Sequence, residues 1–137
     1  MSIELTVVTP EGQAFREDVT SVVLPGTEGD FGVLEDHEIF LTGLRIGEMR
    51  IERPGETLYA ALSKGFADVR SKSVSVMVGS CEFAHEIDAE RAEIAVDRAR
   101  KQLEEMRASE EGEETYQAYQ DAYSRAISRR GVSTHKG

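Results

Sequence analysis

The stretch Ile87-Asp88-Ala89-Glu90-Arg91-Ala92 decides the fold, because the spacing of apolar residues changes on either side of it. Before it, apolar residues alternate with polar ones, as in half-buried strands; after it, they recur every three or four residues, which predicts amphipathic helices. Asp88 is a candidate N-cap, since a carboxylate there accepts a hydrogen bond from a first-turn amide, and Glu90 suits the positive end of the helix dipole. We therefore expect a strand domain at residues 1–84 and a helical unit at 85–137.

The segment before this boundary contains many short runs with strand character. In the first, Ile3, Leu5 and Val7 alternate with polar residues. Glycine, proline or polar turns separate the later runs, which lie at residues 19–24, 39–44, 49–52, 58–62, 66–69 and 74–78, with a further short strand in the glycine-rich stretch 27–34. Since no helical run interrupts them, these strands predict an antiparallel β-sandwich or flattened barrel.

Two apolar stripes follow the boundary. The first predicts a helix at about residues 88–107 and consists of Ala92, Ala95, Val96, Ala99, Leu103 and Met106. The second predicts a helix at about 113–130 and consists of Tyr116, Tyr119, Ala122, Tyr123, Ala126 and Ile127. A short link favours an antiparallel hairpin. Because alanine buries little apolar area, we expect the hairpin to be weakly held, to hinge at 86–88, and to fray from Gly131 onward.

The overall composition narrows the class of protein. The 137 residues carry 26 acidic and 16 basic side chains, a net charge of -10, which argues against nucleic acid or an anionic membrane surface as a direct partner. The single cysteine, Cys81, forms no internal disulfide and suits a reducing compartment. No apolar run approaches the roughly 18 to 20 residues that span a bilayer, and the start lacks signal-peptide features. We expect a soluble, cytoplasmic protein without a transmembrane segment.

The chain offers few candidates for bond chemistry. Glu35-Asp36-His37-Glu38 contains metal-ligating side chains, but adjacent residues do not easily converge on one ion, so we predict no metal site. Neither the order of residues nor any motif pairs Cys81 with a histidine, and the serines fall in strands and turns. We therefore predict no catalytic residues.

The arginines of the predicted hairpin are a candidate binding set. Arg98 and Arg129 have no acidic residue three or four positions away along their helices, whereas Arg91 and Arg125 each have an aspartate within reach. In an antiparallel hairpin, Arg98 lies level with Arg125, and Arg91 roughly level with Arg129. Arginine suits phosphate because its planar fork donates two hydrogen bonds at once. One interpretation is four guanidiniums facing one anion.

Several motifs together resemble the family of epsilon subunits of bacterial proton-driven rotary ATP synthases. They occur in the expected order over nearly the whole chain and are Gly26–Leu34, His37, Leu41-Thr42-Gly43-Leu44, Gly47, Arg50-Ile51, Ser63–Val69 and the Ile-Asp-x-x-Arg-Ala motif at Ile87–Ala92. The resemblance implies an N-terminal β-sandwich and a C-terminal two-helix hairpin. The same fold follows from the periodicity alone.

The resemblance also implies a function in the central stalk. The sandwich is expected to grip the gamma subunit and to sit on the membrane ring of c subunits, so that proton-driven rotation is coupled to ATP synthesis without any catalysis by this chain. The hairpin is expected to regulate or inhibit ATP hydrolysis by reaching the alpha and beta subunits of the catalytic head when it extends. The expected location is the cytoplasmic face of the bacterial inner membrane, as a peripheral part of the synthase.

Two sets of residues are matched to the family's contacts. Glu28, Asp30 and His37 are expected to face the rotor ring and gamma, although Glu35-Asp36 stands where Pro-Gly is common before the histidine, and Glu38-Ile39 where Ala-Pro is common after it. In some bacterial members the folded hairpin binds ATP, and the matching positions are Ile87, Asp88, Arg91, Ala92, Arg98, Arg125 and Arg129.

ATP would then be a regulatory ligand, and no cofactor is required. Under the other interpretation, Asp88 is only a helix cap and the arginines pair with acids on gamma or the catalytic head. The alternative function, outside any rotary complex, is a free-standing nucleotide-sensing or adaptor module that uses the same hairpin.

Overall fold

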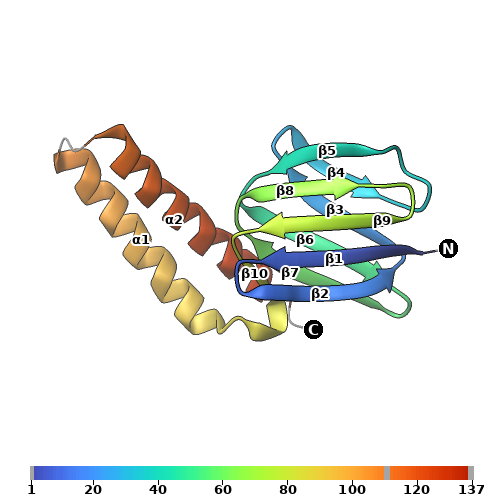
Figure 1. Ribbon diagram of the computed structural model, residues 1–137. Helices are drawn as coiled ribbons and strands as arrows, with labels where there is room; N and C mark the ends of the chain where they lie inside the picture. The colour runs from blue at the N-terminus through green and yellow to red at the C-terminus, as the bar shows by residue number, and fades with distance from the viewer. Residues whose placement is uncertain (1, 110–111, 136–137) are drawn as a thin grey trace.

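The computed structural model describes residues 2–109 and 112–135, and these form a strand domain with a helical hairpin at one end (Figure 1). The strands are β1 (Ile3–Thr9), β2 (Gly12–Val19), β3 (Ser21–Gly26), β4 (Gly29–Val33), β5 (Phe40–Leu44), β6 (Gly47–Arg53), β7 (Glu56–Leu62), β8 (Gly65–Val69), β9 (Ser73–Val78) and β10 (Cys81–Phe83). The helices are the 3-10 turn η1 (Ala84–Glu86), α1 (Ala89–Ser109) and α2 (Glu113–Ser133).

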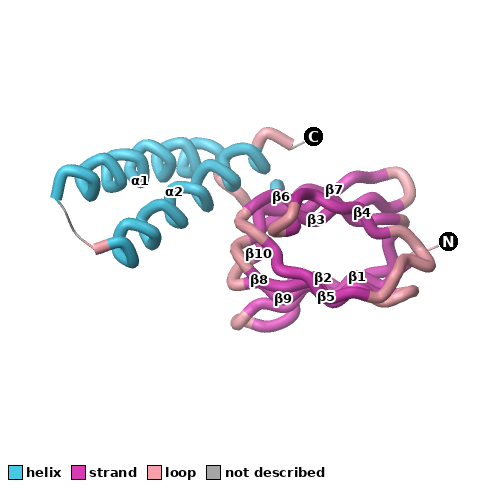
Figure 2. Tube along the Cα trace, turned by 90° about the horizontal axis from the view of Figure 1, so that it is seen from above, coloured by secondary structure: helices cyan, strands magenta, loops and turns pink. Residues whose placement is uncertain are grey.

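The strands form one sheet that curls into two facing layers, as Figure 2 shows from above. Their order is β10-β7-β6-β3-β5-β8-β9-β1-β2, and β4 pairs with β3 outside this path. The predicted β-sandwich is therefore confirmed. One pairing differs from a purely antiparallel sheet, because β1 and β9 run parallel from Glu4 opposite Ser73 to Val8 opposite Met77.

Alternate residues of both layers fill the space between them. Leu5, Leu24, Met49 and Ile51 are fully buried there, together with Val7, Val22, Val33, Val69 and Val76. These large aliphatic side chains supply the area that holds the two layers together. Phe15 packs on Phe83 at the margin of this core, with ring centroids 5.5 Å apart.

Three strands differ from the sequence-based expectation, and the shortest of them is β10, which has only three residues and lies beyond the last predicted run. β2 was not predicted, because most of its residues are exposed on both faces and show no alternation. The run expected at 19–24 is divided, since Val19 ends β2 and β3 begins at Ser21. An edge strand such as β2 is held by backbone pairing to β1 rather than by burial of one face, so its side chains carry little signal.

The boundary stretch forms a structured joint between the sandwich and the hairpin. Ile87 is extended and only 1% exposed. Asp88 caps α1 as expected, since its Oδ1 accepts a hydrogen bond of 3.0 Å from the backbone amide of Arg91. Ile87 packs with Ala92 of α1, Ala84 of η1, Ala61 of β7 and Val132 of α2. One small cluster thus ties all parts of the joint together.

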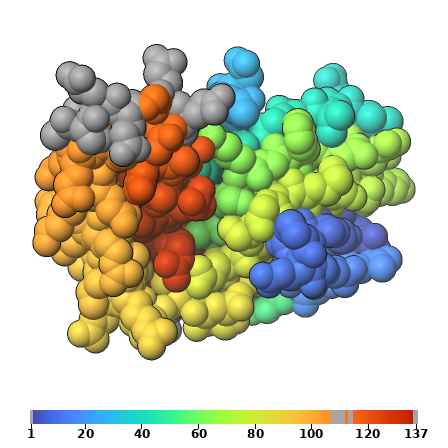
Figure 3. All heavy atoms as spheres, turned by 60° about the vertical axis from the view of Figure 1, so that its left-hand side comes forward, coloured from blue at the N-terminus to red at the C-terminus, as the bar shows by residue number. Residues whose placement is uncertain are grey.

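Of the two helices, α2 faces the sandwich and α1 lies outside it (Figures 1 and 3). Apart from α1, the elements that α2 contacts most are β7, β6 and η1. The expectation that the chain frays from Gly131 is wrong for residues 131–133, because α2 continues to Ser133 and Val132 is 1% exposed. Residues 136–137, which the expectation also covered, lie outside the described residues. Burial of Val132 against the sandwich keeps the last turn in place. No helix in the described ranges is both long and apolar enough to cross a membrane.

Candidate functional site

A cleft of about 410 Å³ lies between the hairpin and the adjoining end of the sandwich. Small alanines on both helices form much of its wall, which leaves room between longer polar side chains. Its lining comprises Ala95, Arg98, Ala99 and Gln102 of α1, Ala122, Arg125, Ala126 and Arg129 of α2, and Ala61, Leu62, Ser63, Ser80 and Glu82 of the sandwich. The cleft is therefore an alanine-walled space bordered by three guanidiniums.

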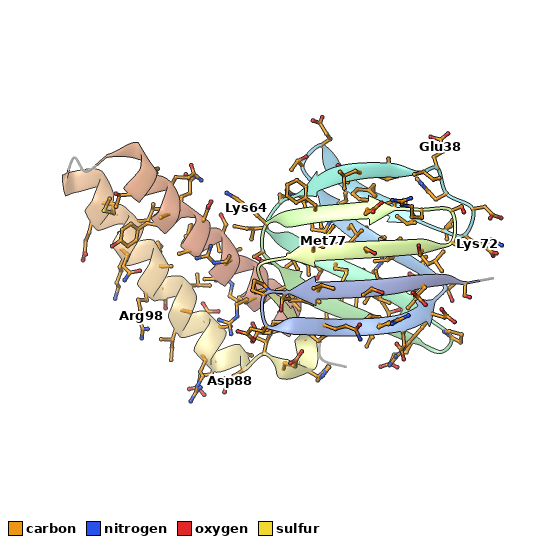
Figure 4. All side chains as sticks on the ribbon, in the orientation of Figure 1. Glu38, Lys64, Lys72, Met77, Asp88 and Arg98 are labelled. Atoms are coloured by element: carbon orange, nitrogen blue, oxygen red, sulfur yellow. The ribbon has the colours of Figure 1, made fainter. Side chains whose placement is uncertain are left out.

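Three of the four predicted arginines meet at this cleft, namely Arg98, Arg125 and Arg129. Arg91 is not among the lining residues; it lies exposed in the first turn of α1, next to Asp88 at the foot of the helix (Figure 4). The antiparallel arrangement predicted from the sequence thus brings one pair, Arg98 and Arg125, to a common space. Of the second predicted pair, Arg91 and Arg129, only Arg129 lines the cleft.

The three guanidiniums differ in how their charge is compensated. Arg129 donates two hydrogen bonds to Glu82 of β10, from Nε at 2.6 Å and from Nη2 at 3.2 Å. These bonds raise the pKa of Arg129 and fix its charge. Within the described residues, Arg98 and Arg125 form no salt bridge, because Asp121, the helical neighbour of Arg125, binds Lys64 of the sandwich at 2.8 Å instead. Arg98 and Arg125 thus border the cleft without a salt bridge among the described residues, although the charge of Arg125 still acts on Asp121 and helps to lower its pKa. Two guanidiniums without a direct carboxylate partner suit an anionic ligand.

The remaining predicted ligand residues have packing and capping roles. Ile87 and Ala92 are 1% and 0% exposed inside the joint cluster, and Asp88 caps α1. None of these side chains lines the cleft. The Ile-Asp-x-x-Arg-Ala motif therefore builds the base that positions the two helices, and the arginines farther along them provide the charge.

The residues expected to meet the rotor ring and gamma lie at two separate places. Glu28 is exposed in the turn before β4, and Asp30 beside it binds Arg45, whose Nη2 lies 2.5 Å from Oδ1 of Asp30. His37 lies in the loop beyond the other end of β4, where its ring rests 5.3 Å from that of Phe40. The structure therefore does not gather these residues into one site.

An apolar row crosses the outer face of the layer that contains β5, β8, β9 and β1. Phe66 of β8 is opposite Met77 of β9, and Met77 is opposite Val8 of β1. Leu41 of β5 continues the row, since it lies two residues from Gly43, the partner of Phe66. The exposed fractions are 69% for Leu41, 57% for Phe66, 43% for Met77 and 39% for Val8. Met77 marks the middle of this face in Figure 4.

Sequence reasoning missed this apolar row, although a signal for it was present. The buried residues of β8 and β9 are Ala67, Val69, Val74, Val76 and Val78. Phe66 and Met77 fall on the opposite parity and must therefore point away from the core. Large apolar residues on the solvent side of two adjacent strands indicate a surface that another molecule covers.

Comparison with known proteins identifies the family. Residues 2–84 match the family of ATP synthase delta/epsilon chain beta-sandwich domains. An ATP synthase epsilon chain of Pelotomaculum thermopropionicum is 46% identical over 99 residues, which cover 72% of this chain and 74% of that protein. The chain belongs to the ATP synthase epsilon-chain family. An epsilon chain of Geotalea daltonii, 34% identical over 135 residues, extends the match to 98% of this chain and 96% of that protein, so the likeness includes the hairpin.

Solved structures show the same fold. A chain in the cryo-EM structure of the Euglena gracilis mitochondrial ATP synthase, which contains OSCP, F1 and the c-ring, aligns with a TM-score of 0.79. That match covers 98% of this chain and 82% of the other, at 23% sequence identity. A second match, in the central stalk and c-ring of the Tetrahymena thermophila enzyme, has a TM-score of 0.54 at 14% identity.

As a member of the ATP synthase epsilon-chain family, the protein is a non-catalytic subunit. Its cysteine is not an activated nucleophile, because burial and the nearby carboxylates of Glu86 and Glu82 raise the pKa of Cys81 to about 12. The thiol therefore stays protonated at neutral pH. In the ranges 2–109 and 112–135, no three His, Cys, Asp or Glu side chains are grouped so that they would hold a metal ion.

Proposed function

We propose that this epsilon chain works in the central stalk of a rotary ATP synthase, where its sandwich joins the gamma subunit to the ring of c subunits. It would thereby couple proton-driven rotation of the ring to ATP synthesis in the catalytic head. The observation that carries this proposal is the apolar row of Val8, Leu41, Phe66 and Met77, which lies on the layer that the hairpin does not mainly contact. A broad apolar strand face of this kind suits a permanent protein partner.

The polar turns at the ends of β4 supply further contacts in this proposal. Glu28 and Asp30 stand at one end and His37 beyond the other, so we assign them to two different contacts among gamma and the c-ring. The loop of His37 is tied to the neighbouring turn, because the amide of Asp36 donates to the carbonyl of Ser71 at 2.7 Å. Such an anchored loop offers a defined surface to a partner.

Co-purification tests the docking of gamma. Phe66→Asp should abolish recovery of co-expressed gamma, because it places a charge in the middle of the apolar row. Thr57→Asp is the matched control, since Thr57 is also exposed on a strand but lies in β7 of the other layer. Circular dichroism should show both variants folded. Gamma that binds Phe66→Asp as well as it binds the native chain would contradict the proposed face, and gamma that never binds would favour the free-standing nucleotide-sensing module.

The hairpin is proposed to regulate ATP hydrolysis by leaving the sandwich. Alanine-rich contacts and exposed ion pairs hold it, so the cost of release is modest. Once extended, its basic residues Arg125, Arg129 and Arg130 would meet acidic surfaces of the alpha and beta subunits. Truncation after His85 should raise ATP hydrolysis in the assembled enzyme without loss of assembly. Unchanged hydrolysis would argue against an inhibitory hairpin.

ATP is proposed as the regulatory ligand of the cleft. Arg98 and Arg125 border the cleft with guanidiniums that form no salt bridge among the described residues, and a bound ligand would stabilise the docked hairpin by mass action. Calorimetry with the full chain should show one ATP bound, and Arg98→Ala should weaken binding. Arg100→Ala should not, because Arg100 points elsewhere and pairs with Asp97 at 3.6 Å. No heat and no thermal shift at millimolar ATP would exclude this ligand.

The proposed location follows from the proposed assembly. A subunit that binds both the shaft and the c-ring would lie at the cytoplasmic face of the bacterial inner membrane, held there by its protein partners. Recovery of the chain in membrane fractions that contain gamma, and its loss from them in the Phe66→Asp variant, would test this location.

A further inference from the structure

The end of α2 is fastened to the sandwich by its last described residues. Val132 is 1% exposed within the joint cluster, and Ser133 is 5% exposed, with its hydroxyl donating to the carbonyl of Arg130 at 2.6 Å. The next turn carries His135 out over the strands β6 and β7. This segment is therefore a built contact between the hairpin and the sandwich.

His135 makes two contacts that both depend on its charge. Its ring stacks on that of Tyr59 in β7, with centroids 3.8 Å apart and planes 12° from parallel. Its Nε2 lies 2.7 Å from Oε1 of Glu48 in β6. The aromatic face and the carboxylate both attract a protonated imidazole more strongly than a neutral one, which keeps the stack on Tyr59 and a weaker Nε2–H hydrogen bond to Glu48. Histidine is also the side chain that changes charge between about pH 5 and 8.

Few other charged groups face this contact. On the same face of β6 lie Arg50 and Glu52, which pair with each other at 3.7 Å. From α2, the groove beside His135 is bordered by Ser124, Ile127, Ser128, Gly131 and Val132, which are uncharged. In η1, which also packs on α2, His85 lies against Phe83 and Glu86 accepts the amide of Phe83. Glu48 is thus the charged group that His135 contacts directly.

We propose that His135 is a protonation-controlled latch, which holds the hairpin on the sandwich when the imidazole is charged and loosens it when the imidazole is neutral. This inference rests on the proposed release of the hairpin from the sandwich. It adds a chemical signal to that motion, namely the pH on the side of the membrane where the chain lies. Acidification favours the docked hairpin, and alkalinisation favours the free one.

The other ion pairs across the joint provide an internal contrast. Lys64 with Asp121, and Arg129 with Glu82, also connect the sandwich to α2. Lysine, arginine and carboxylates keep their charges between pH 6 and 8. Among the described contacts between sandwich and hairpin, the pair of His135 and Glu48 is therefore the one that changes in this range. Its side chains are 36% and 41% exposed, so the expected effect is about three-fold in the ratio of docked to free hairpin.

Fluorescence energy transfer in the full chain tests this latch. Donor and acceptor dyes are attached at Lys72→Cys, in the turn between β8 and β9, and at Lys101→Cys, on the exposed face of α1, in a Cys81→Ser background. Between pH 6 and pH 8, the docked-to-free ratio should fall about three-fold. His135→Gln and Glu48→Gln should remove this pH dependence.

Two control variants separate the latch from general weakening. Lys64→Met should lower the docked fraction at both pH values and keep the pH dependence, because it removes a pair whose charge does not change. His85→Gln should keep the native response. In the unlabelled chain, NMR signals of the His135 ring should show an upfield ring-current shift from Tyr59 that diminishes as the pH rises.

The outcomes distinguish the latch from the motion on which it rests. If the hairpin leaves the sandwich in Lys64→Met or at high salt but the docked-to-free ratio does not change with pH, the latch is overturned. The proposed motion of the hairpin would then stand. The same holds if the pH dependence persists in His135→Gln. A hairpin that stays docked in every variant and at every pH would overturn both.

Discussion

The sandwich core and the joint beneath the hairpin are built from different side chains. The sandwich buries leucine, isoleucine, valine, methionine and phenylalanine between its layers. The joint and the hairpin bury several alanines, and their larger buried members are Ile87, Val96, Leu103, Met106 and Val132. The stabilising free energy of burial scales with the apolar area removed from water. The core of the sandwich therefore stabilises the sandwich by itself, whereas a much smaller buried apolar area holds the hairpin in place.

The two regions also differ in their use of charge. The joint is bordered by ion pairs from three places along α2, namely Asp121 with Lys64, Arg129 with Glu82 and His135 with Glu48. Exposed or half-buried pairs of this kind contribute little each, and their contribution depends on salt and pH. Buried aliphatic side chains thus make the sandwich rigid, whereas ion pairs at the joint hold the hairpin in a way that salt and pH change.

The largest expected effect is in the sandwich core. Leu24→Ala should lower the free energy of unfolding by about 2 to 5 kcal/mol, because it removes buried methyl groups and leaves a cavity in a packed interior. Leu41→Ala is the matched control; its side chain is 69% exposed, and the change should stay within about 0.5 kcal/mol. Urea denaturation measures both. Equal losses would mean that the core does not have the role assigned to it.

A smaller effect, confined to the hairpin, is expected at the joint. Ile87→Ala should weaken hairpin docking by about 2 kcal/mol, since Ile87 is the largest side chain in that cluster. Native-state hydrogen exchange should show lost protection in α2 and unchanged protection in β9. Ile94→Ala, at a position 53% exposed on α1, should leave both unchanged. Equal loss of protection in β9 would show that sandwich and hairpin unfold as one unit.

The ion pair at the cleft should contribute less than the joint cluster. Arg129→Gln removes both hydrogen bonds to the half-buried Glu82 and should weaken docking by about 1 kcal/mol. Arg130→Gln serves as the control, because Arg130 pairs with Glu93 of α1 within the hairpin. Exchange rates of α2 amides should rise in the first variant more than in the second. The reverse order would place the main polar contact inside the hairpin.

The smallest expected effect concerns Lys64 and Asp121. The hydrogen bond from Lys64 lowers the pKa of Asp121 below its ordinary 3.8. A lowered pKa in the folded state means that this contact stabilises docking above pH 3.8 and is lost as the pH falls through the folded value. Lys64→Met should raise the pKa of Asp121 towards 3.8 and cost less than about 1 kcal/mol at neutral pH. NMR titration of the Asp121 carboxyl group measures the shift, and an unchanged pKa would contradict the assignment.

Much of the fold could be predicted from local pattern. The change of apolar spacing at Ile87–Ala92 marks the joint, and the alternation in β1 and β9 follows from burial on one side. The missing features depend on distant contacts. The parallel pairing of β1 with β9 has no local signature, and the burial of Val132 is decided by Ala61 and Ala84 from other parts of the chain.

The cleft could be predicted in part for the same reason. Counting from the hairpin turn predicts that Arg98 is level with Arg125, and both residues line the same cleft. The count cannot show that Glu82 of β10 binds Arg129, or that Lys64 binds Asp121, because Glu82 and Lys64 come from the sandwich. Helical spacing predicts which residues are neighbours along one helix, but it does not predict which residues of the sandwich contact that helix.

The parallel pairing of β1 with β9 also sets an order of assembly during synthesis. The first strand leaves the ribosome with β2 but has an unpaired edge until residues 73–78 follow. The sandwich therefore closes only when most of its own sequence has been made, and long-range closure of this kind is the slow step in strand folding. The hairpin is translated after the sandwich and meets a platform whose strands have already been made, so a defective or shortened hairpin leaves the sandwich intact.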